Sequence, residues 1–225
     1  MIWKNKKQKS KVHQMANRVI ALVALPFVSI ILAPQLLAWP HKLVVGDTTI
    51  YAEHPIAPEI KSVLTQSDAL LRRSAIYSDS YGKRIFLTEG GWRWRLLALN
   101  NAGGLAISRP LGSIIITHNS VSENWVKSDG QIGKTRSLSS IIAHERTHDL
   151  IRAHFGLLSD MRYPKWKREG YCDYIAQESS LNAVQVAAFK KQGRGHPAIV
   201  YFEGRQKVTR ALDVERKSVD QLFIE

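Results

Sequence analysis

The sequence predicts an α+β domain with a small N-terminal sheet and C-terminal helices, preceded by one transmembrane helix. Three observations lead to this prediction: an uncharged segment near the N-terminus, strand-like segments after it, and helical patterns from Ser137 onward. Strands followed by helices are typical of α+β domains. The chain has 225 residues, so residues 40–225 have the size of one domain that can bury a substantial core.

The N-terminal region predicts a membrane anchor. Residues 1–18 form a basic tail with six Lys or Arg residues and no acid, and residues 19–39 carry no charge. A helix of that length, at ~1.5 Å per residue, spans the ~30 Å hydrocarbon core of a bilayer. Pro26 and Pro34 are tolerated in membrane helices. We therefore expect an uncleaved signal-anchor over residues 19–39.

The charge flanking this segment predicts its orientation. The positive-inside rule places the basic tail in the cytoplasm and residues 40–225 on the extracytoplasmic side, periplasmic or extracellular. A cleaved signal peptide is the alternative, although Ala38 before Trp39 and Pro40 is a poor cleavage site. A buried helix of a soluble domain is the third interpretation, and the adjacent basic tail disfavours it.

Short segments of the main domain are predicted as strands or helices from their apolar patterns. Lys42–Tyr51, Arg84–Thr88 and Ser113–Thr117 read as strands, and Ala57–Ser74 reads as a helix between the first two. Further helices are predicted at Ser137–Phe155, Pro164–Ala176, Leu181–Lys191 and Val214–Phe223.

The helix Ser137–Phe155 contains the pentapeptide His144-Glu145-Arg146-Thr147-His148. Ser137 is a suitable N-cap, and Gly156 can end the helix in a left-handed conformation. Residues four apart share one helix face, so both imidazoles can reach one metal ion, and imidazole pairs suit Zn²⁺. Glu145 then lies where it can take a proton from a water molecule. The alternative is a surface helix with two solvated histidines, which the amphipathic pattern of the segment disfavours.

A third zinc ligand is expected downstream, and Glu169 is the candidate. It lies on the predicted helix Pro164–Ala176, after a turn long enough to bring this helix alongside the first. Asp173 falls one turn later on the same face, where it can accept a hydrogen bond from a ligating histidine. The alternative is a solvated Glu/Asp pair on an exposed face.

These residues carry a resemblance to a known family. His144-Glu145-x-x-His148, followed by Trp166-x-x-Glu169-Gly170-x-Cys172-x-Tyr174, resembles the gluzincin zinc metallopeptidases, thermolysin-like and of the peptidase MA-like kind. Cys172 stands where alanine is usual. The resemblance covers residues 137–176.

The resemblance implies a zincin-like fold with Glu169 as third ligand and Asp173 as support for a histidine. It also implies a sheet whose edge strand lines the cleft, for which Ser113–Thr117 is the candidate; an ordinary core strand is the equal alternative. An oxyanion-stabilising Tyr or His follows the third ligand in this family, and Tyr174, His196 and Tyr201 qualify by order alone.

The expected function is therefore that of a membrane-anchored zinc metallopeptidase acting on a peptide or protein. Zn²⁺ is the expected cofactor, and Glu145 is the expected general base. Two alternatives remain open: a non-peptidase zinc hydrolase, and a membrane-tethered binding or assembly module with a vestigial zinc site. Retention of Glu145 argues against the second.

The net charge of +13 raises the question of nucleic-acid binding. We expect no nucleic-acid partner, because the charge is diffuse and no recognition motif accompanies it. Two basic-aromatic clusters, Trp92–Arg95 and Lys165–Arg168, are candidates to contact anionic lipid or an acidic peptide; the alternative is a solvated face.

Cys172 is the only cysteine of the sequence, so no internal disulfide forms, and we interpret it as a small buried side chain.

Overall fold

The computed structural model describes Met15, Arg18, Leu22 and residues 24–79, 81–109, 111–128 and 135–224. The chain divides into two compact units, Met1–Ala38 and Trp39–Glu225. Of the predicted basic tail at residues 1–18, only Met15 and Arg18 are described, and positions 19–21 and 23 of the predicted anchor also lie outside the described residues.

The prediction of a transmembrane helix over residues 19–39 was wrong. No helix among the described residues is both long enough and apolar enough to cross a membrane. The described helix ends at Leu32, Ala33 leaves the helical region (φ −132°, ψ 72°), and Pro34 begins the 3₁₀ turn η1 (Pro34–Leu36). Proline disfavours the α conformation of the residue before it and donates no backbone hydrogen bond, so Pro34 ends the helix early.

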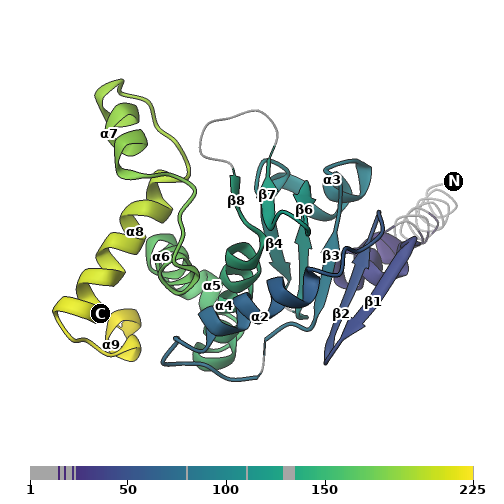
Figure 1. The fold of residues 1–225 in the computed structure, drawn as a ribbon, viewed down its shortest axis with the longest axis horizontal. Coiled ribbons are helices and arrows are strands. Elements are labelled where there is room, and N and C mark those ends of the chain that lie inside the picture. The colour runs from purple at the N-terminus through teal and green to yellow at the C-terminus, as the bar shows by residue number, and fades with distance from the viewer. Residues whose placement is uncertain are drawn as a thin grey trace, which may run out of the picture. The chain divides into compact units, whose positions relative to one another are not determined.

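The described part of Trp39–Glu225 is α+β, as predicted (Figure 1). Its strands are β1 (His41–Val45), β2 (Thr48–Ala52), β3 (Arg84–Leu87), β4 (Ala106–Arg109), β5 (Ser113–Ile116), β6 (Asn119–Ser120), β7 (Trp125–Lys127) and β8 (Thr135–Ser137). Its helices are α2 (Ile60–Leu71), α3 (Trp92–Ala98), α4 (Leu138–Phe155), α5 (Ser159–Arg162), α6 (Lys165–Ala176), α7 (Ala183–Lys191), α8 (Ile199–Thr209) and α9 (Val219–Ile224), with a 3₁₀ turn η2 (Leu99–Asn101) and a π-helical turn η3 (Arg210–Val214).

Within the described residues the main sheet has five strands in the order β1-β2-β3-β5-β4. Strands β2, β3 and β5 are parallel, and β1 and β4 run antiparallel to their neighbours. Ile50, Ile85 and Ile114 lie side by side in register and are fully buried. They form one core with apolar residues of α2 and α4, so both helices cover this face of the sheet.

The predicted strand Lys42–Tyr51 is in fact a hairpin. Strands β1 and β2 are antiparallel, with Val45 opposite Thr48, so Gly46 and Asp47 form a two-residue turn. Gly46 has φ +59°, a conformation that such hairpin turns require and that glycine adopts without strain. The turn residues Gly46-Asp47 were the signal for the hairpin.

Ser113–Thr117 was predicted as a strand, and β5 occupies Ser113–Ile116, but it is not the edge strand. Strand β5 pairs with β3 on one side and β4 on the other, and all four of its residues are buried. The edge strand beside β5 is β4 (Ala106–Arg109), which sequence reasoning missed, and β1 forms the opposite edge. The alternative interpretation of Ser113–Thr117 as an ordinary core strand is therefore the correct one.

Helix α4 lies between the sheet and the C-terminal helices α6 and α8 (Figure 1). A second core joins α4 and α6 through buried Leu150, Ile151 and Tyr171, and Phe223 of α9 packs against it. Helices α6 and α8 cross at two glycines: a Cβ on Gly170 would lie 2.4 Å from the carbonyl carbon of Gly204. This close approach packs α8 against the N-terminal half of α6, which carries Glu169.

Candidate metal centre

The helix with the His-Glu-x-x-His motif belongs to the core. Ser137 caps α4 by accepting a hydrogen bond from the backbone of Ser140, and its own hydroxyl donates to Glu178. Gly156 ends the helix with φ +95° and ψ 158°, a positive φ as predicted, although its ψ lies outside the left-handed helical region. Residues 138–152 are all buried. This burial contradicts the interpretation of a surface helix with solvated histidines.

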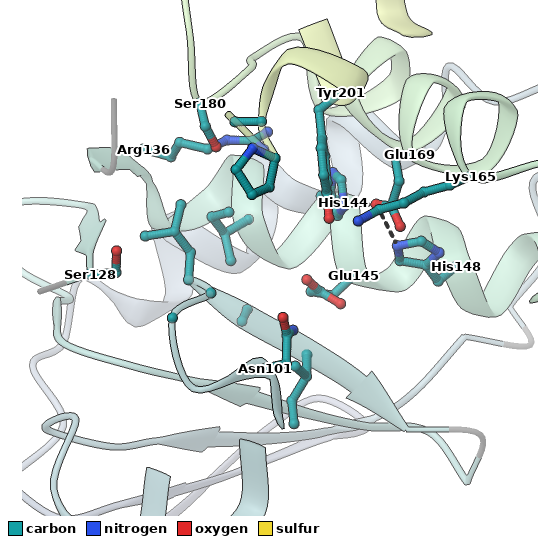
Figure 2. Close-up of a pocket in the computed structure, with 18 of the residues that line it drawn as sticks. Asn101, Ser128, Arg136, His144, Glu145, His148, Lys165, Glu169, Ser180 and Tyr201 are labelled. Atoms are coloured by element: carbon teal, nitrogen blue, oxygen red, sulfur yellow. Dashed lines mark ion pairs between the residues drawn. The ribbon is translucent and has the colours of Figure 1, made fainter. Parts of the chain in front are cut away.

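The three predicted ligands converge on one point. Oε2 of Glu169 lies 3.3 Å from Nε2 of His144 and 3.4 Å from Nε2 of His148, the second contact being drawn in Figure 2. Charge-assisted N–H···O bonds are shorter, ~2.7–2.9 Å. Two donors bound to one zinc ion at ~2.0–2.1 Å in tetrahedral geometry lie ~3.3–3.4 Å apart. The donor set therefore fits Zn²⁺ better than it fits a pair of hydrogen bonds.

Cys172 offers a second donor close to the same histidines. Its Sγ lies within 4.8 Å of a ligating atom of both His144 and His148. However, Cys172 is fully buried and does not line the pocket, whereas Glu169 does. Burial, together with the negative charge of Glu169, raises the pKa of the thiol well above its ordinary value, so the thiol keeps its proton and is a poor ligand. Glu169 is the better third ligand.

Asp173 contacts His144 on the side of the ring opposite the candidate metal donor. Its Oδ1 lies 2.8 Å from Nδ1 of His144 and also accepts a 2.8 Å hydrogen bond from Arg136. Arg136 further donates to the hydroxyl of Ser140 and the carbonyl oxygen of Glu178, so the guanidinium is fixed to both α4 and α6. This arrangement leaves Nε2 of His144 as the nitrogen that faces the other two donors.

The electrostatics of the cluster follow from these contacts. Burial alone would lower the pKa of His144, but the hydrogen bond that its ring donates to Asp173 and its contact with the carboxylate of Glu169 raise it to about 9. Burial alone would raise the pKa of Glu169, but His148 and His144 lower it well below its ordinary range. For Asp173 burial acts in the same way, and Arg136 and His144 together more than offset it, so the pKa of Asp173 is also lowered. Without a metal, His144 is thus a protonated imidazolium at neutral pH and lies between the carboxylates of Asp173 and Glu169.

The donors open onto a pocket of about 440 Å³. Figure 2 shows Glu145 extending into this pocket beside His148, between Tyr201 on one side and Asn101 on the other. One wall is formed by the edge of the sheet and the loop before it, namely Asn100, Asn101, Gly103, Gly104, Leu105, Ala106 and Ile107. The pocket therefore combines three candidate metal donors, one further carboxylate and the edge of a strand.

The three oxyanion candidates lie in different places. Tyr201 and His196 line the pocket, and the ring of Tyr201 stacks on that of His144 with centroids 6.1 Å apart. The Nδ1 atom of His196 accepts a hydrogen bond from the backbone of Ala198, which leaves Nε2–H as the donor of the neutral ring. Tyr174 is not a lining residue, and its hydroxyl donates to Asp213. The structure brings Tyr201 and His196 to the site and leaves Tyr174 outside it.

Sequence reasoning missed Arg136, Asn101 and the helix that carries Tyr201. Arg136 precedes the N-cap of α4 and has no motif around it. Its role as the partner of a buried carboxylate is recognisable only from its contact with Asp173 in the structure.

The chain as a whole finds no match among models of known protein families, curated proteins or solved structures.

Proposed function

We propose that this protein is a zinc-dependent peptidase that hydrolyses peptide bonds in the pocket formed by α4, α6, α8 and β4. The observation that supports this proposal most directly is that Glu169 lies at the spacing of two zinc ligands from both His144 and His148, with Glu145 in the same pocket. The resemblance of both motifs to gluzincin metallopeptidases points the same way.

The proposed roles follow from position. His144, His148 and Glu169 hold the zinc ion, which when bound acidifies water and polarises a carbonyl group. Glu145 accepts the proton of the attacking water and passes it to the leaving amine. A structural zinc site has no use for such a base, and structural sites are closed by four protein ligands. Glu145 and the open pocket therefore favour a catalytic site over a vestigial one.

The edge strand β4 is suited to align an extended substrate. Leu105 accepts a hydrogen bond from the backbone of Thr117, so in the antiparallel ladder Leu105 and Ile107 bond to β5 while Ala106 and Ser108 turn their backbone groups away from it. A peptide can add to this edge by backbone hydrogen bonds. This favours a peptide over a small ester or amide as the substrate.

Tyr201 is the first choice for stabilising the oxyanion. It stacks on His144, lines the pocket, and is kept neutral because burial and the nearby carboxylates raise its pKa. A neutral phenol donates a hydrogen bond, and the loss of one such donor costs ~10²- to 10³-fold in rate. His196 is the second donor that the pocket offers.

The test is proteolysis of an unstructured protein by the full-length chain, with zinc and with a chelator. We expect zinc-dependent cleavage and about one zinc per chain by elemental analysis. Glu145→Gln should keep the metal and lose ~10²- to 10⁴-fold in rate, whereas His148→Ala should lose the metal itself. Cleavage by a metal-free sample, or full activity of Glu145→Gln, would contradict the proposal.

A further inference from the structure

Lys165 is the first residue of α6 and lines the pocket. It lies one turn before Glu169 on the same helix face. Its ammonium lies 5.1 Å from the ring centroid of Tyr201, the ring that stacks on His144. Figure 2 shows the side chain reaching back along α6 toward Tyr201 and the zinc ligands. Lys165 therefore places a positive charge at the mouth of the metal centre.

The other cations of the basic-aromatic cluster Lys165–Arg168 already have partners. Lys167 is buried and donates to the carbonyl oxygen of Phe223, and Arg168 bonds Asp160. Among the described residues, no carboxylate forms an ion pair with Lys165, although Glu169 follows at i+4. Within this cluster, Lys165 is therefore the cation that lines the pocket without an ion pair among the described residues, and the ring of Tyr201 is its neighbour.

The lining of the pocket is poor in negative charge. Among its described residues the only acids are Glu145 and Glu169, the proposed base and zinc ligand, against the cations Lys165 and Arg136. Arg136 is neutralised by Asp173. When zinc is bound, the two carboxylates are offset by the ion, and the charge of Lys165 remains unbalanced. An anionic group on the substrate would restore neutrality.

We propose that the site prefers peptides with a carboxylate close to the scissile bond, and that Lys165 binds this carboxylate. The proposal rests on the proposed peptidase function and names its substrate class. Either an acidic side chain or the free C-terminus of a peptide supplies this chemistry. Lys165 is thus a residue that determines specificity, distinct from the groups that carry out hydrolysis.

The experiment measures two peptide pairs with the full-length protein. In the first pair a glutamate within three residues of the scissile bond is replaced by glutamine, and in the second the free C-terminus is replaced by an amide. We expect kcat/KM to be higher for the acid form of at least one pair by roughly three- to tenfold, the range between an exposed ion pair and a charge-assisted hydrogen bond. The responding pair identifies the source of the carboxylate.

Variants of Lys165 connect this preference to the residue. Lys165→Met should bring the acid-to-neutral ratio close to one, Lys165→Arg should restore it in part, and Lys165→Glu should invert it. Lys61→Met is the matched control, because Lys61 is an exposed lysine of α2 that does not line the pocket; it should keep the wild-type ratio. Added salt should reduce the preference of the wild type.

A binding measurement separates this inference from the proposed function. In Glu145→Gln, the Kd of each peptide can be measured without turnover, with and without the change Lys165→Met. If the wild type cleaves no peptide, the peptidase proposal fails, while a Lys165-dependent difference in Kd would still support carboxylate binding. If peptides are cleaved with no preference in either pair, or if Lys165→Met leaves the preference unchanged, Lys165 does not select the substrate.

Discussion

Nδ1 of His144 lies 2.8 Å from Oδ1 of Asp173, and that same oxygen accepts a hydrogen bond from Arg136. The carboxylate of Asp173 is fully buried, which disfavours its charged form. The two contacts outweigh this effect and lower its pKa, so the carboxylate stays charged. It fixes the ring of His144 with Nε2 toward Glu169 and His148. Two buried side chains, Asp173 and Arg136, thus orient the nitrogen of His144 that we propose as a metal donor.

The first prediction concerns the order of damage around this contact. Asp173→Asn should retain the fold and reduce zinc affinity ~10- to 100-fold. The change removes no proposed ligand and only weakens the hydrogen bond that orients His144. Glu169→Gln should reduce affinity further, because it removes an anionic donor. Competition with a chelator of known affinity measures both. If Asp173→Asn abolishes binding while Glu169→Gln retains it, Asp173 is the third ligand and the present assignment is reversed.

A second prediction concerns Arg136. Arg136→Met leaves the buried carboxylate of Asp173 without its cation, a change that typically costs ~3–5 kcal/mol of stability. Because Asp173 then lacks one of its two anchors, zinc affinity should also fall. Arg168→Met is the control: Arg168 pairs with Asp160, and neither residue lines the pocket, so this variant should lower stability only modestly and leave zinc affinity unchanged. Equal losses of zinc affinity in the two variants would argue against a positioning role.

A third prediction concerns pH. The pKa of His144 is about 9 in the metal-free folded protein and near 6.5 in an unfolded chain, so the folded state holds this proton more tightly. The resulting stability is fully present below pH ~6.5 and is lost as pH rises through ~9. The thermal midpoint of the metal-free protein should therefore fall over this interval. A flat or rising midpoint would show that His144 is not held as an imidazolium.

The same proton must leave when zinc binds. Apparent zinc affinity should consequently rise with pH up to ~9, with about one proton released per ion between pH 7 and 8.5. Calorimetry in two buffers of different ionisation enthalpy measures the proton count directly. Zinc-saturated protein should lack the stability loss described for the metal-free form.

A fourth prediction concerns the crossing of α6 and α8. Gly170→Ala places a methyl group against the backbone of Gly204, which neither helix can relieve by a side-chain rotation. We expect a loss of ~1–3 kcal/mol in the free energy of unfolding, as for other overpacked cores. Gly195→Ala is the matched control, because an added Cβ there meets no atom within 4 Å. Equal stability of the two variants would mean that the helices do not need this close approach.

Local signals explain which parts of the molecule the sequence predicts well. The cap at Ser137, the amphipathic pattern and the glycine at position 156 define α4, and helical periodicity then places His144, His148 and Glu145 on the pocket side. The hairpin at Gly46 was missed although its turn residues are present in the sequence. The membrane helix was predicted from the length of an uncharged segment and its basic flank, and Pro34 was interpreted as tolerated, whereas the helix ends before it.

The remaining parts depend on tertiary contacts that no local pattern records. Helix α8 has apolar residues on several faces and Gly204 in its middle, so it lacks a helical signature, yet its packing on Gly170 brings Tyr201 to the site. Strand β4 is recognisable as the edge only from its pairing with β5. Arg136 gains its role from Asp173, a residue on another helix.

The succession of α4 and α6 along the chain has a consequence for the order of folding. The three residues that we propose as zinc donors come from these two helices, which only the short α5 separates, so their contact closes a small loop at little entropic cost. The parallel pairs β2–β3 and β3–β5 join segments that lie somewhat farther apart in the chain, and parallel pairing is slow to form, whereas β4 and β5 form a local hairpin. We expect the proposed donor cluster and the β4–β5 hairpin to form early in folding, because their contacts are local, and the parallel pairing of the sheet to follow.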